Sequence, residues 1–264
     1  MRKYKILIVL LALITQSGWA QQDSAFNQLD ENGLKHGKWR SFYQNGQVQK
    51  EGQFRHGEPF DVFKIYFHNG KIKSILNYDE EDSKKVYATH YYETGDKMAE
   101  GPYLDQKKQG LWKTYGAGEV LLTEGSYVAD KKYGMWKTYH RNGQLAMEVL
   151  IENDLEQGPM KKYFDDGSIQ EEATYKDGFK EGTTIIYTPE GDTSTVGSYY
   201  KDAKDGEWRY YNEKKEIEKV IKYDKGKLLT PETGDGEVES MEEFKDNRKD
   251  ELEFEDLRGP IRYE

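Results

Sequence analysis

Cysteine is absent from this chain of 264 residues, and histidine occurs only five times. Without cysteine no disulfide framework can form, and no lipid can be attached to a thiol after export. The chain also lacks a Walker-type phosphate loop, a His-Glu-x-x-His helix and a Gly-x-Ser-x-Gly elbow. These absences remove the commonest signals of nucleotide, metalloprotease and serine-hydrolase chemistry. The fold must therefore be held by packing and strand pairing alone.

A basic patch is lacking as well, because the formal net charge is −10. Residues 228–264 hold 13 acidic and five basic side chains. Proteins that bind nucleic acid or anionic membranes need clustered positive charge. We therefore expect neither nucleic-acid binding nor strong binding to anionic membranes. The acidic C-terminal tail, residues 228–264, is predicted either to cap the preceding domain or to remain disordered.

The longest apolar run, ILIVLLALI, lies close to the N-terminus. It follows Arg2, Lys3 and Lys5 and precedes Gly18-Trp19-Ala20. A basic start, a short apolar run and small residues before a cut site are typical of a secretory signal peptide. The run is short for a membrane span. The sequence thus predicts a signal peptide over residues 1–20, cleaved after Ala20, and a secreted or periplasmic protein.

The rest of the chain is organised by a repeat. The segment QGLWKTYGAGEVLLTEGSYV is followed by YGMWKTYHRNGQLAMEVLI, and their shared positions lie 24 residues apart. A fixed period of this length indicates one small unit stacked on copies of itself. We count eight copies over residues 34–227, after a short lead of residues 21–33. One extra residue between Asp79 and Lys85 shifts the third copy.

Three positions define the repeat. The first, called the tryptophan slot, holds Trp39, Phe63, Ala88, Trp112, Trp136, Met160, Thr184 and Trp208. The second, three residues later, is aromatic in every copy: Phe42, Tyr66, Tyr91, Tyr115, Tyr139, Tyr163, Tyr187 and Tyr211. The third closes the copy with an aromatic residue, except in the fifth copy: Phe54, Tyr78, Tyr103, Tyr127, Ile151, Tyr175, Tyr199 and Tyr223.

Each copy is predicted to be a β-hairpin. In the first copy, two runs of alternating apolar and polar residues flank Asn45-Gly46. Asn-Gly between such runs is the strongest short-range hairpin signal, and it indicates a two-residue turn. The predicted fold is all-β, an elongated array of antiparallel hairpins that forms a twisted sheet.

Counting outward from that turn predicts the register of the strands. It places Arg40 opposite Glu51 and Trp39 opposite Gly52. In later copies the same count pairs Lys113 with Glu124, Lys137 with Glu148, Lys161 with Glu172, and Glu100 with Thr89. In the seventh copy both members change together, to Ile185 and Val196. This joint change is internal evidence that the two positions touch.

One face of the sheet is predicted to be packed. Strand alternation places there the tryptophan slot, the closing aromatics and a set of repeated glycines. We expect each ring to cover a glycine of the opposing strand, which protects backbone that would otherwise be exposed. The structural positions are Trp39, Trp112, Trp136 and Trp208 with Gly37, Gly110, Gly134, Gly158, Gly182 and Gly206.

The opposite face is the candidate binding surface. It carries the aromatic row and the predicted ion pairs, namely Tyr66, Tyr91, Tyr115, Tyr139, Tyr163, Tyr187, Tyr211, Lys113, Lys137, Lys161, Glu124, Glu148 and Glu172. Two interpretations remain open. The rings form a structural ladder that covers the sheet, or they form an extended surface for a peptide, a glycan or another protein.

Candidate catalytic and metal-binding residues would have to stand outside the repeat pattern. The histidines, His36, His56, His68, His90 and His140, fall in different repeat positions, so no metal site is expected. The recurrent glutamates Glu51, Glu100, Glu124, Glu148 and Glu172 suggest paired carboxylates, but each also fits the repeat consensus. The repeats occupy about 194 residues, and neither flank could hold a catalytic domain. We expect no enzyme activity and no cofactor.

The segments GKWRSFYQNGQVQKEGQF, GLWKTYGAGEVLLTEGSY and GEWRYYNEKKEIEKVIKY resemble the MORN (membrane occupation and recognition nexus) repeat variant. Bacterial chains made only of such repeats resemble the group named YwqK-type antitoxins. The resemblance implies a hairpin array with a scaffolding or interaction role. We therefore expect an exported protein that binds another protein or an envelope component. Two alternatives are a carbohydrate-binding or carbohydrate-modifying protein and an antitoxin-like partner of an effector.

Overall fold

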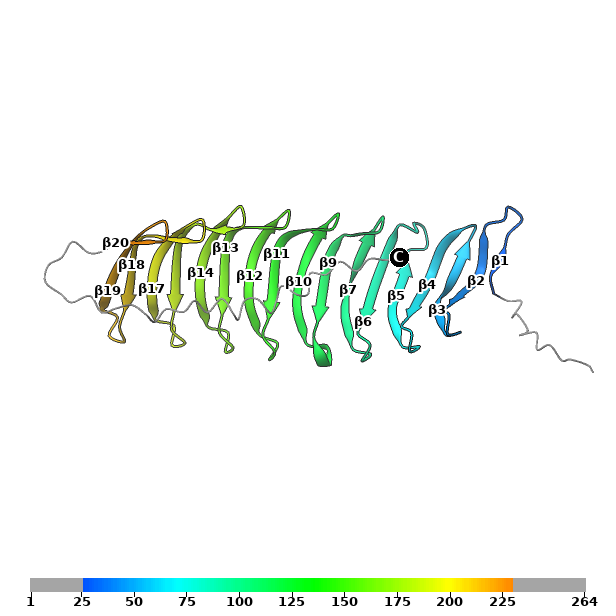
Figure 1. Cartoon of the computed structure of the whole chain (residues 1–264), viewed down its shortest axis with the longest axis horizontal. Coiled ribbons are helices and arrows are strands. Elements are labelled where there is room, and N and C mark those ends of the chain that lie inside the picture. The colour runs from blue at the N-terminus through cyan, green and yellow to red at the C-terminus, as the bar shows by residue number, and fades with distance from the viewer. Residues whose placement is uncertain (1–25, 230–264) are drawn as a thin grey trace, which may run out of the picture.

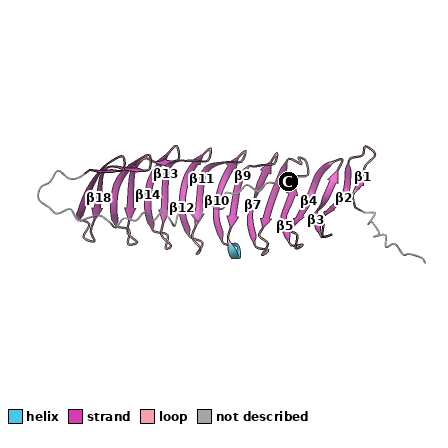
Figure 2. Cartoon of the chain, viewed as in Figure 1, coloured by secondary structure: helices cyan, strands magenta, loops and turns pink. Residues whose placement is uncertain are grey.

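The computed structural model describes residues 26–229, which form one long ribbon of antiparallel strands (Figure 1). Twenty strands make a single sheet in these residues, and each long strand pairs with the long strands before and after it in sequence. The only helical element in this range is the 3-10 turn η1 (Ala117–Glu119), drawn in cyan in Figure 2. The predicted all-β hairpin array is confirmed. A helix long and apolar enough to cross a membrane does not occur between residues 26 and 229.

Eight hairpins build the sheet, as the repeat count predicts. Their strand pairs are β2 (Lys35–Phe42) with β3 (Val48–Arg55), β4 (Glu58–Tyr66) with β5 (Ile72–Tyr78), β6 (Lys85–Tyr91) with β7 (Lys97–Leu104), β9 (Gly110–Tyr115) with β10 (Leu121–Val128), β11 (Lys131–Tyr139) with β12 (Leu145–Glu152), β13 (Leu155–Tyr163) with β14 (Ile169–Lys176), β16 (Gly182–Tyr187) with β17 (Thr193–Tyr200), and β18 (Ala203–Tyr211) with β19 (Ile217–Asp224). The hairpin turns lie along one long edge and the connectors along the other (Figure 1).

Short strands complete the ribbon and its ends. β8 (Lys107–Lys108) and β15 (Phe179–Lys180) precede β9 and β16, while β20 (Lys227–Leu229) pairs with β19. β1 (Gln28–Leu29) pairs with β2, so the predicted lead of residues 21–33 contributes a strand to the sheet. The predicted signal peptide, its cut after Ala20, and residues 230–264 of the predicted tail lie outside the described residues.

The predicted turn type is wrong, although the register it gave is right. The Tyr43 backbone N–H donates to the Gln47 carbonyl oxygen, so the loop is three residues long, and Gly46 adopts a φ of 81°. A three-residue loop has one residue more than the predicted turn. A bulge between Ser41 and Phe42 offsets that residue, so the pairs further from the turn keep the predicted register. Two-residue turns instead join most of the hairpins, where both turn residues have positive φ, as in Asp177-Gly178, while a longer loop joins β5 to β6.

The predicted register is confirmed away from the turns. Arg40 faces Glu51, Lys113 faces Glu124, Lys137 faces Glu148 and Lys161 faces Glu172. Ile185 faces Val196, so the joint change in the seventh copy does mark a contact pair. Glu100 faces Thr89 as predicted.

A wide bulge separates most hairpins from the one before, with the junction of β5 and β6 as an exception. Between β10 and β11, Glu124 pairs with Lys137 and Ser126 pairs with Tyr133. The three residues from Gly134 to Trp136 therefore lie opposite Gly125 alone. Gly134 has a φ of 82°, a backbone conformation that glycine adopts without steric cost. The bulge turns the Trp136 ring onto the preceding hairpin.

This geometry corrects the predicted role of the repeated glycines. Gly37, Gly110, Gly134, Gly158, Gly182 and Gly206 have positive φ, between 71° and 95°, and a side chain at these positions would meet no aromatic ring. Rings instead cover Gly101, Gly125 and Gly197, each in the hairpin before that of the covering tryptophan. The prediction placed each ring over its own hairpin because counting from the turn ignores the bulge.

The volume of the residue in the tryptophan slot is matched to the volume of the residue that it covers in the preceding hairpin. Phe63, Trp112, Trp136 and Trp208 lie over Gly52, Gly101, Gly125 and Gly197. Where the tryptophan slot holds a smaller residue, the facing residue is larger, giving Leu76 with Ala88, Val149 with Met160, and Ala173 with Thr184. Between Leu76 and Ala88 the strands pair without a bulge. Each copy therefore fills the same space, which close packing requires.

The tryptophan slot forms the core of the ribbon. Trp112, Met160, Thr184 and Trp208 are each at most 2% exposed. The closing aromatics stand edge-on between these rings, with centroids 5.1 Å apart for Tyr127 and Trp136. The indole N–H groups of Trp112, Trp136 and Trp208 donate to carbonyl oxygens of the preceding hairpin, from Trp136 to Ser126 over 3.2 Å, and that of Trp39 donates to Gln28 of the N-terminal lead. The predicted packed face is confirmed, and we call it the indole face.

Candidate functional site

The face opposite the indole face carries a row of alternating charges. Glu124 pairs with Lys113 on one neighbouring strand and with Lys137 on the other. Glu148 lies in the same way between Lys137 and Lys161. The ion pairs are Arg40 with Glu51 at 2.9 Å, Lys161 with Glu172 at 2.9 Å and Lys113 with Glu124 at 3.9 Å. We call this surface, with its tyrosine row, the charged face.

Tyrosines tie each hairpin of the charged face to the one before it. The Tyr139 hydroxyl donates to Glu124 over 2.6 Å, although the two residues belong to different hairpins. Tyr163 donates to Glu148 and Tyr187 to Glu172, both over 2.8 Å. The same contact joins Tyr66 to Glu51 and Tyr115 to Glu100.

These contacts shift the acidity of both partners. Burial, followed by the hydrogen bond to a glutamate, raises the pKa of Tyr66, Tyr139 and Tyr163 to about 12. The hydrogen bond from Tyr66 lowers the pKa of Glu51, and those from Lys161 and Tyr187 lower the pKa of Glu172. The carboxylates are thus held ionised beside neutral tyrosines.

Two members of the predicted row, Tyr91 and Tyr211, lie outside this pattern. The positions that would supply their glutamates hold Ile75 and Val196. The alternating charge row is interrupted at the same two places, where Ile75 faces Thr89 and Ile185 faces Val196. Tyr91 and Tyr211 therefore mark the ends of a central charged segment.

The tyrosine–glutamate contact should contribute measurably to stability. We expect Tyr139→Phe to lower the free energy of unfolding by about 1.5 to 3 kcal/mol, because a part-buried carboxylate loses a donor. Urea denaturation followed by tryptophan fluorescence measures the change.

The matched control is Tyr211→Phe. Val196 stands at the position where the other tyrosines find their glutamate partner. Tyr211→Phe should lower the free energy of unfolding clearly less than Tyr139→Phe does. A double-mutant cycle of Tyr139→Phe with Glu124→Gln should give a coupling energy of at least about 0.5 kcal/mol. Additive losses would mean that the hydroxyl and the carboxylate contribute independently.

Apolar side chains extend the charged face toward the connector edge. Leu111, Val128, Tyr133 and Met135 are 46–50% exposed and come from the adjacent strands β9, β10 and β11. Leu111 and Tyr133 both pair with Ser126, and Met135 lies two residues from Lys137 on its strand. We call these four residues the apolar patch. Sequence reasoning missed it because they occupy no conserved-looking position of the repeat.

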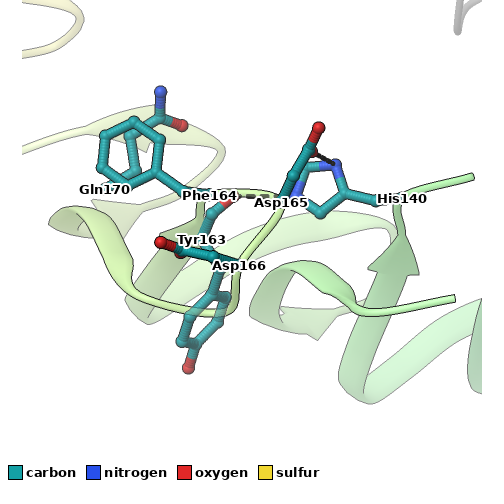
Figure 3. A pocket seen from close by; sticks show the side chains of 6 residues that line it. All are labelled: His140, Tyr163, Phe164, Asp165, Asp166 and Gln170. Atoms are coloured by element: carbon teal, nitrogen blue, oxygen red, sulfur yellow. Dashed lines mark hydrogen bonds and ion pairs between the residues drawn. The ribbon is translucent and has the colours of Figure 1, made fainter. Parts of the chain in front are cut away.

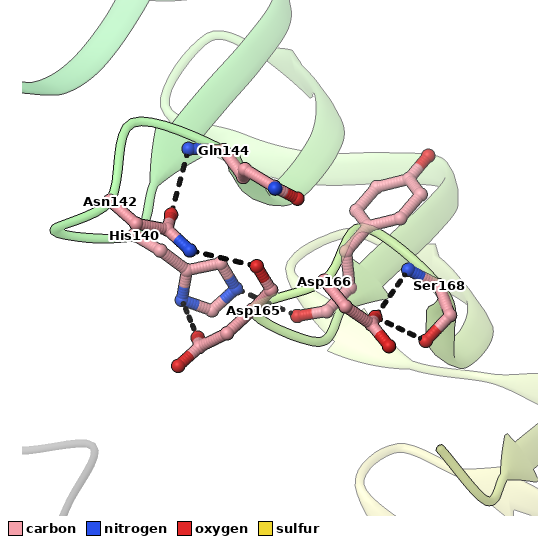
Figure 4. Close-up of polar contacts among 7 residues, drawn as sticks. His140, Asn142, Gln144, Asp165, Asp166 and Ser168 are labelled. Atoms are coloured by element: carbon pink, nitrogen blue, oxygen red, sulfur yellow. Dashed lines mark hydrogen bonds and ion pairs between the residues drawn. The ribbon is translucent and has the colours of Figure 1, made fainter. Parts of the chain in front are cut away.

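A shallow hollow of about 420 Å³ lies at the hairpin-turn edge (Figure 3). It is lined by His140, Tyr163, Phe164, Asp165, Asp166 and Gln170. Figure 4 shows that its polar groups bond to one another. Asn142 donates to the Asp165 carbonyl oxygen over 2.8 Å, and the Ser168 N–H donates to the Asp166 carboxylate over 2.8 Å.

His140 holds two turns together at this hollow. Its Nε2 lies 2.9 Å from the Tyr163 carbonyl oxygen, which can only accept, so Nε2–H is the donor. Its Nδ1 lies 2.9 Å from the Asp165 carboxylate. Tyr43 and Tyr92 occupy the same repeat position and donate to Tyr66 and Tyr115 in the same way. The hollow therefore follows from the stacking of the turns.

Two further groups were missed in the sequence. Lys108, Lys132 and Lys204 lie 4.3–4.6 Å from the centroids of the indoles four residues later and shield these rings from water. Burial lowers the pKa of Lys108. The second group is a cluster of His36, His56 and Asp30 at the N-terminal end of the array. His36 and His56 fall in different repeat positions, as the sequence shows, but the strand register brings them close together.

Comparison with known proteins identifies the repeat. The family model of the MORN repeat variant matches residues 35–56, 62–80, 132–153 and 156–177, which are the first, second, fifth and sixth hairpins. The resemblance to this repeat is confirmed. No curated protein matches the chain.

Among solved structures, a chain in the "Crystal Structure of TcdB2-TccC3-Cdc42" is similar at 13% identity, with a TM-score of 0.21. The match covers 71% of this chain and 11% of that chain.

Proposed function

We propose that this chain, which carries MORN repeat variants, is an exported scaffold without enzyme activity that binds another protein along its charged face. The observation that carries the proposal is the apolar patch. Four large apolar side chains on three adjacent strands are about half exposed, and they adjoin the alternating charges. Protein interfaces combine such an apolar centre with a polar surround.

The architecture supports binding along an extended surface. Among residues 26–229, all strands belong to one sheet, so the charged face has no second sheet layered on it. Repeat arrays present such faces as long interaction surfaces, because every copy contacts only its neighbours. The row of alternating Lys and Glu would select a partner of complementary charge and fix its register.

The carbohydrate alternative has less support. Sugar-binding sites need polar groups aimed at the ligand, with an aromatic ring to stack on. Five tyrosine hydroxyls of the row already donate to glutamates, and those glutamates also face lysine or arginine. The same occupation of the carboxylates argues against carbohydrate-modifying chemistry. Export remains a proposal that rests on the predicted signal peptide.

The test compares two substitutions at equivalent repeat positions. Met135→Asp places a charge in the apolar patch, whereas Thr183→Asp places it two copies further along, outside the patch. The mature wild-type chain and both variants are used to capture partners from the envelope fraction. We expect one protein to be retained by wild type and Thr183→Asp and to be lost with Met135→Asp.

Equal retention by all three proteins would contradict binding at the patch. Specific binding on a glycan array, weakened by Tyr115→Ala with Tyr139→Ala, would favour the carbohydrate alternative instead. Melting curves of the three proteins establish that both variants are folded, since Met135 and Thr183 are exposed.

A further inference from the structure

Three side chains with metal-binding chemistry meet at the N-terminal end of the array. Asp30 lies in the turn between β1 and β2, His36 lies in β2, and His56 lies in the turn between β3 and β4. One ligand atom of each lies within 4.8 Å of the other two. A backbone hydrogen bond of 2.8 Å from Gly57 N–H to the Lys35 carbonyl oxygen fixes the second turn beside β2.

Asp30 is held in position for a ligand. Its Oδ1 accepts hydrogen bonds from the Asn32 and Leu34 backbone N–H groups, each over 2.9 Å. Its Oδ2 lies 2.8 Å from His56 Nδ1, and the side chain is only 8% exposed. One oxygen is thus used by the turn, and the other faces His56.

The two histidines can adjust around this fixed oxygen. The ring centroids of His36 and His56 are 5.2 Å apart, and the His56 side chain is 66% exposed. His56 has a φ of 49°, the conformation shared by the first residue of the other two-residue turns. The backbone therefore places the ring, while the side-chain torsions stay free to turn it.

Two imidazole nitrogens and one carboxylate oxygen match the preferences of zinc. Calcium and magnesium prefer oxygen ligands alone, whereas zinc accepts histidine and aspartate in a tetrahedral site. With bonds of about 2.0–2.1 Å, neighbouring ligand atoms lie about 3.3 Å apart around zinc. Zinc would replace the 2.8 Å contact between His56 Nδ1 and Asp30 Oδ2, so that these two atoms move apart while His36 turns toward them. The fourth position would hold water.

We propose that Asp30, His36 and His56 bind one zinc ion that closes the N-terminal end of the array. The ion joins the turn before β2 to the turn after β3, at the end where the first hairpin has no preceding repeat to cover it. Zinc that binds only the folded chain also stabilises it. The cluster lies at the first hairpin, away from the apolar patch on β9, β10 and β11, and it does not depend on the proposed binding role.

The test uses the tag-free mature chain, because a histidine tag would itself bind zinc. Isothermal titration with zinc chloride should give one ion per chain, and zinc should raise the melting temperature. His36→Gln and His56→Gln should each weaken binding by more than about tenfold. The matched control is His68→Gln, an exposed turn histidine of the next hairpin, which should keep wild-type affinity.

Asp30→Asn adds a second criterion. Its amide oxygen can still accept the two turn hydrogen bonds, but the negative charge is lost, so zinc affinity should fall while the zinc-free melting temperature changes little. Cobalt bound to wild type should show the absorption of a tetrahedral site. Binding of less than one zinc, affinity unchanged by either cluster histidine, or an equal loss with His68→Gln would each overturn the proposal.

Discussion

Gly125→Val should destabilise the array by about 3 kcal/mol. A Cβ atom at Gly125 would lie 2.2 Å from Cδ2 of Trp136, in a ring that is 8% exposed and tied by its N–H to the Ser126 carbonyl oxygen. Overpacking of this kind typically costs about 1–3 kcal/mol, and here backbone and indole leave little room to relax. Valine favours strands over glycine, so the loss would be steric.

The chain itself contains the compensating change. Twenty-four residues further on, Val149 and Met160 occupy the positions of Gly125 and Trp136. Trp136→Met alone should leave a void over Gly125 and also destabilise the array. Combined with Gly125→Val it should recreate the natural pair, so the double variant should be more stable than the sum of the single losses predicts, by about 1–3 kcal/mol.

Chemical denaturation of the four proteins gives the comparison. Ser126→Val is the control, because this neighbouring residue points to the charged face and should cost much less than Gly125→Val. Equal costs at Gly125 and Ser126, or a double variant no better than the sum of its parts, would refute the ring-over-glycine contact as the constraint on this position.

The same contact shows which parts of the fold could be predicted from the sequence. The pairing of Lys137 with Glu148 follows from counting along one hairpin, and that count survives the wrong turn type because the bulge near the tip restores it. The placement of Trp136 over Gly125 requires the offset between hairpins. This offset is set by Gly134, which has a positive φ. The local sequence around Gly134 does not distinguish a bulge from an open turn.

For the functional surfaces too, the sequence predicts contacts within one hairpin but not contacts between hairpins. Strand alternation correctly places the tyrosines and the Lys–Glu pairs on one face. It does not reveal that Tyr139 reaches back to Glu124, since this contact crosses between hairpins. The cluster around His56 was missed for a related reason, because its members come from three separate segments that only backbone pairing brings together.

High pH should unfold the array over a narrow range. Burial raises the pKa of Tyr66, Tyr127, Tyr139 and Tyr163 to about 12, whereas an unfolded tyrosine titrates near 10. A raised folded-state pKa gives stability that is fully present below about pH 10 and is lost as pH rises toward 12. Tyr115, whose pKa is also raised by burial and by its hydrogen bond to Glu100, acts together with these four, so stability should be flat from neutral pH to about 9.5 and then fall steeply.

Urea midpoints measured across this range, with tyrosinate absorbance recorded in parallel, check the expectation. Tyr139→Phe combined with Tyr163→Phe removes two of these groups and should make the alkaline decline shallower, even though the variant is less stable at neutral pH. Val149→Ala is the matched control, because it leaves a cavity without removing a titrating group. It should lower the whole curve and keep its slope. Lysine deprotonation also weakens the ion pairs above pH 10, and an unchanged slope in the double tyrosine variant would assign the decline to lysine instead.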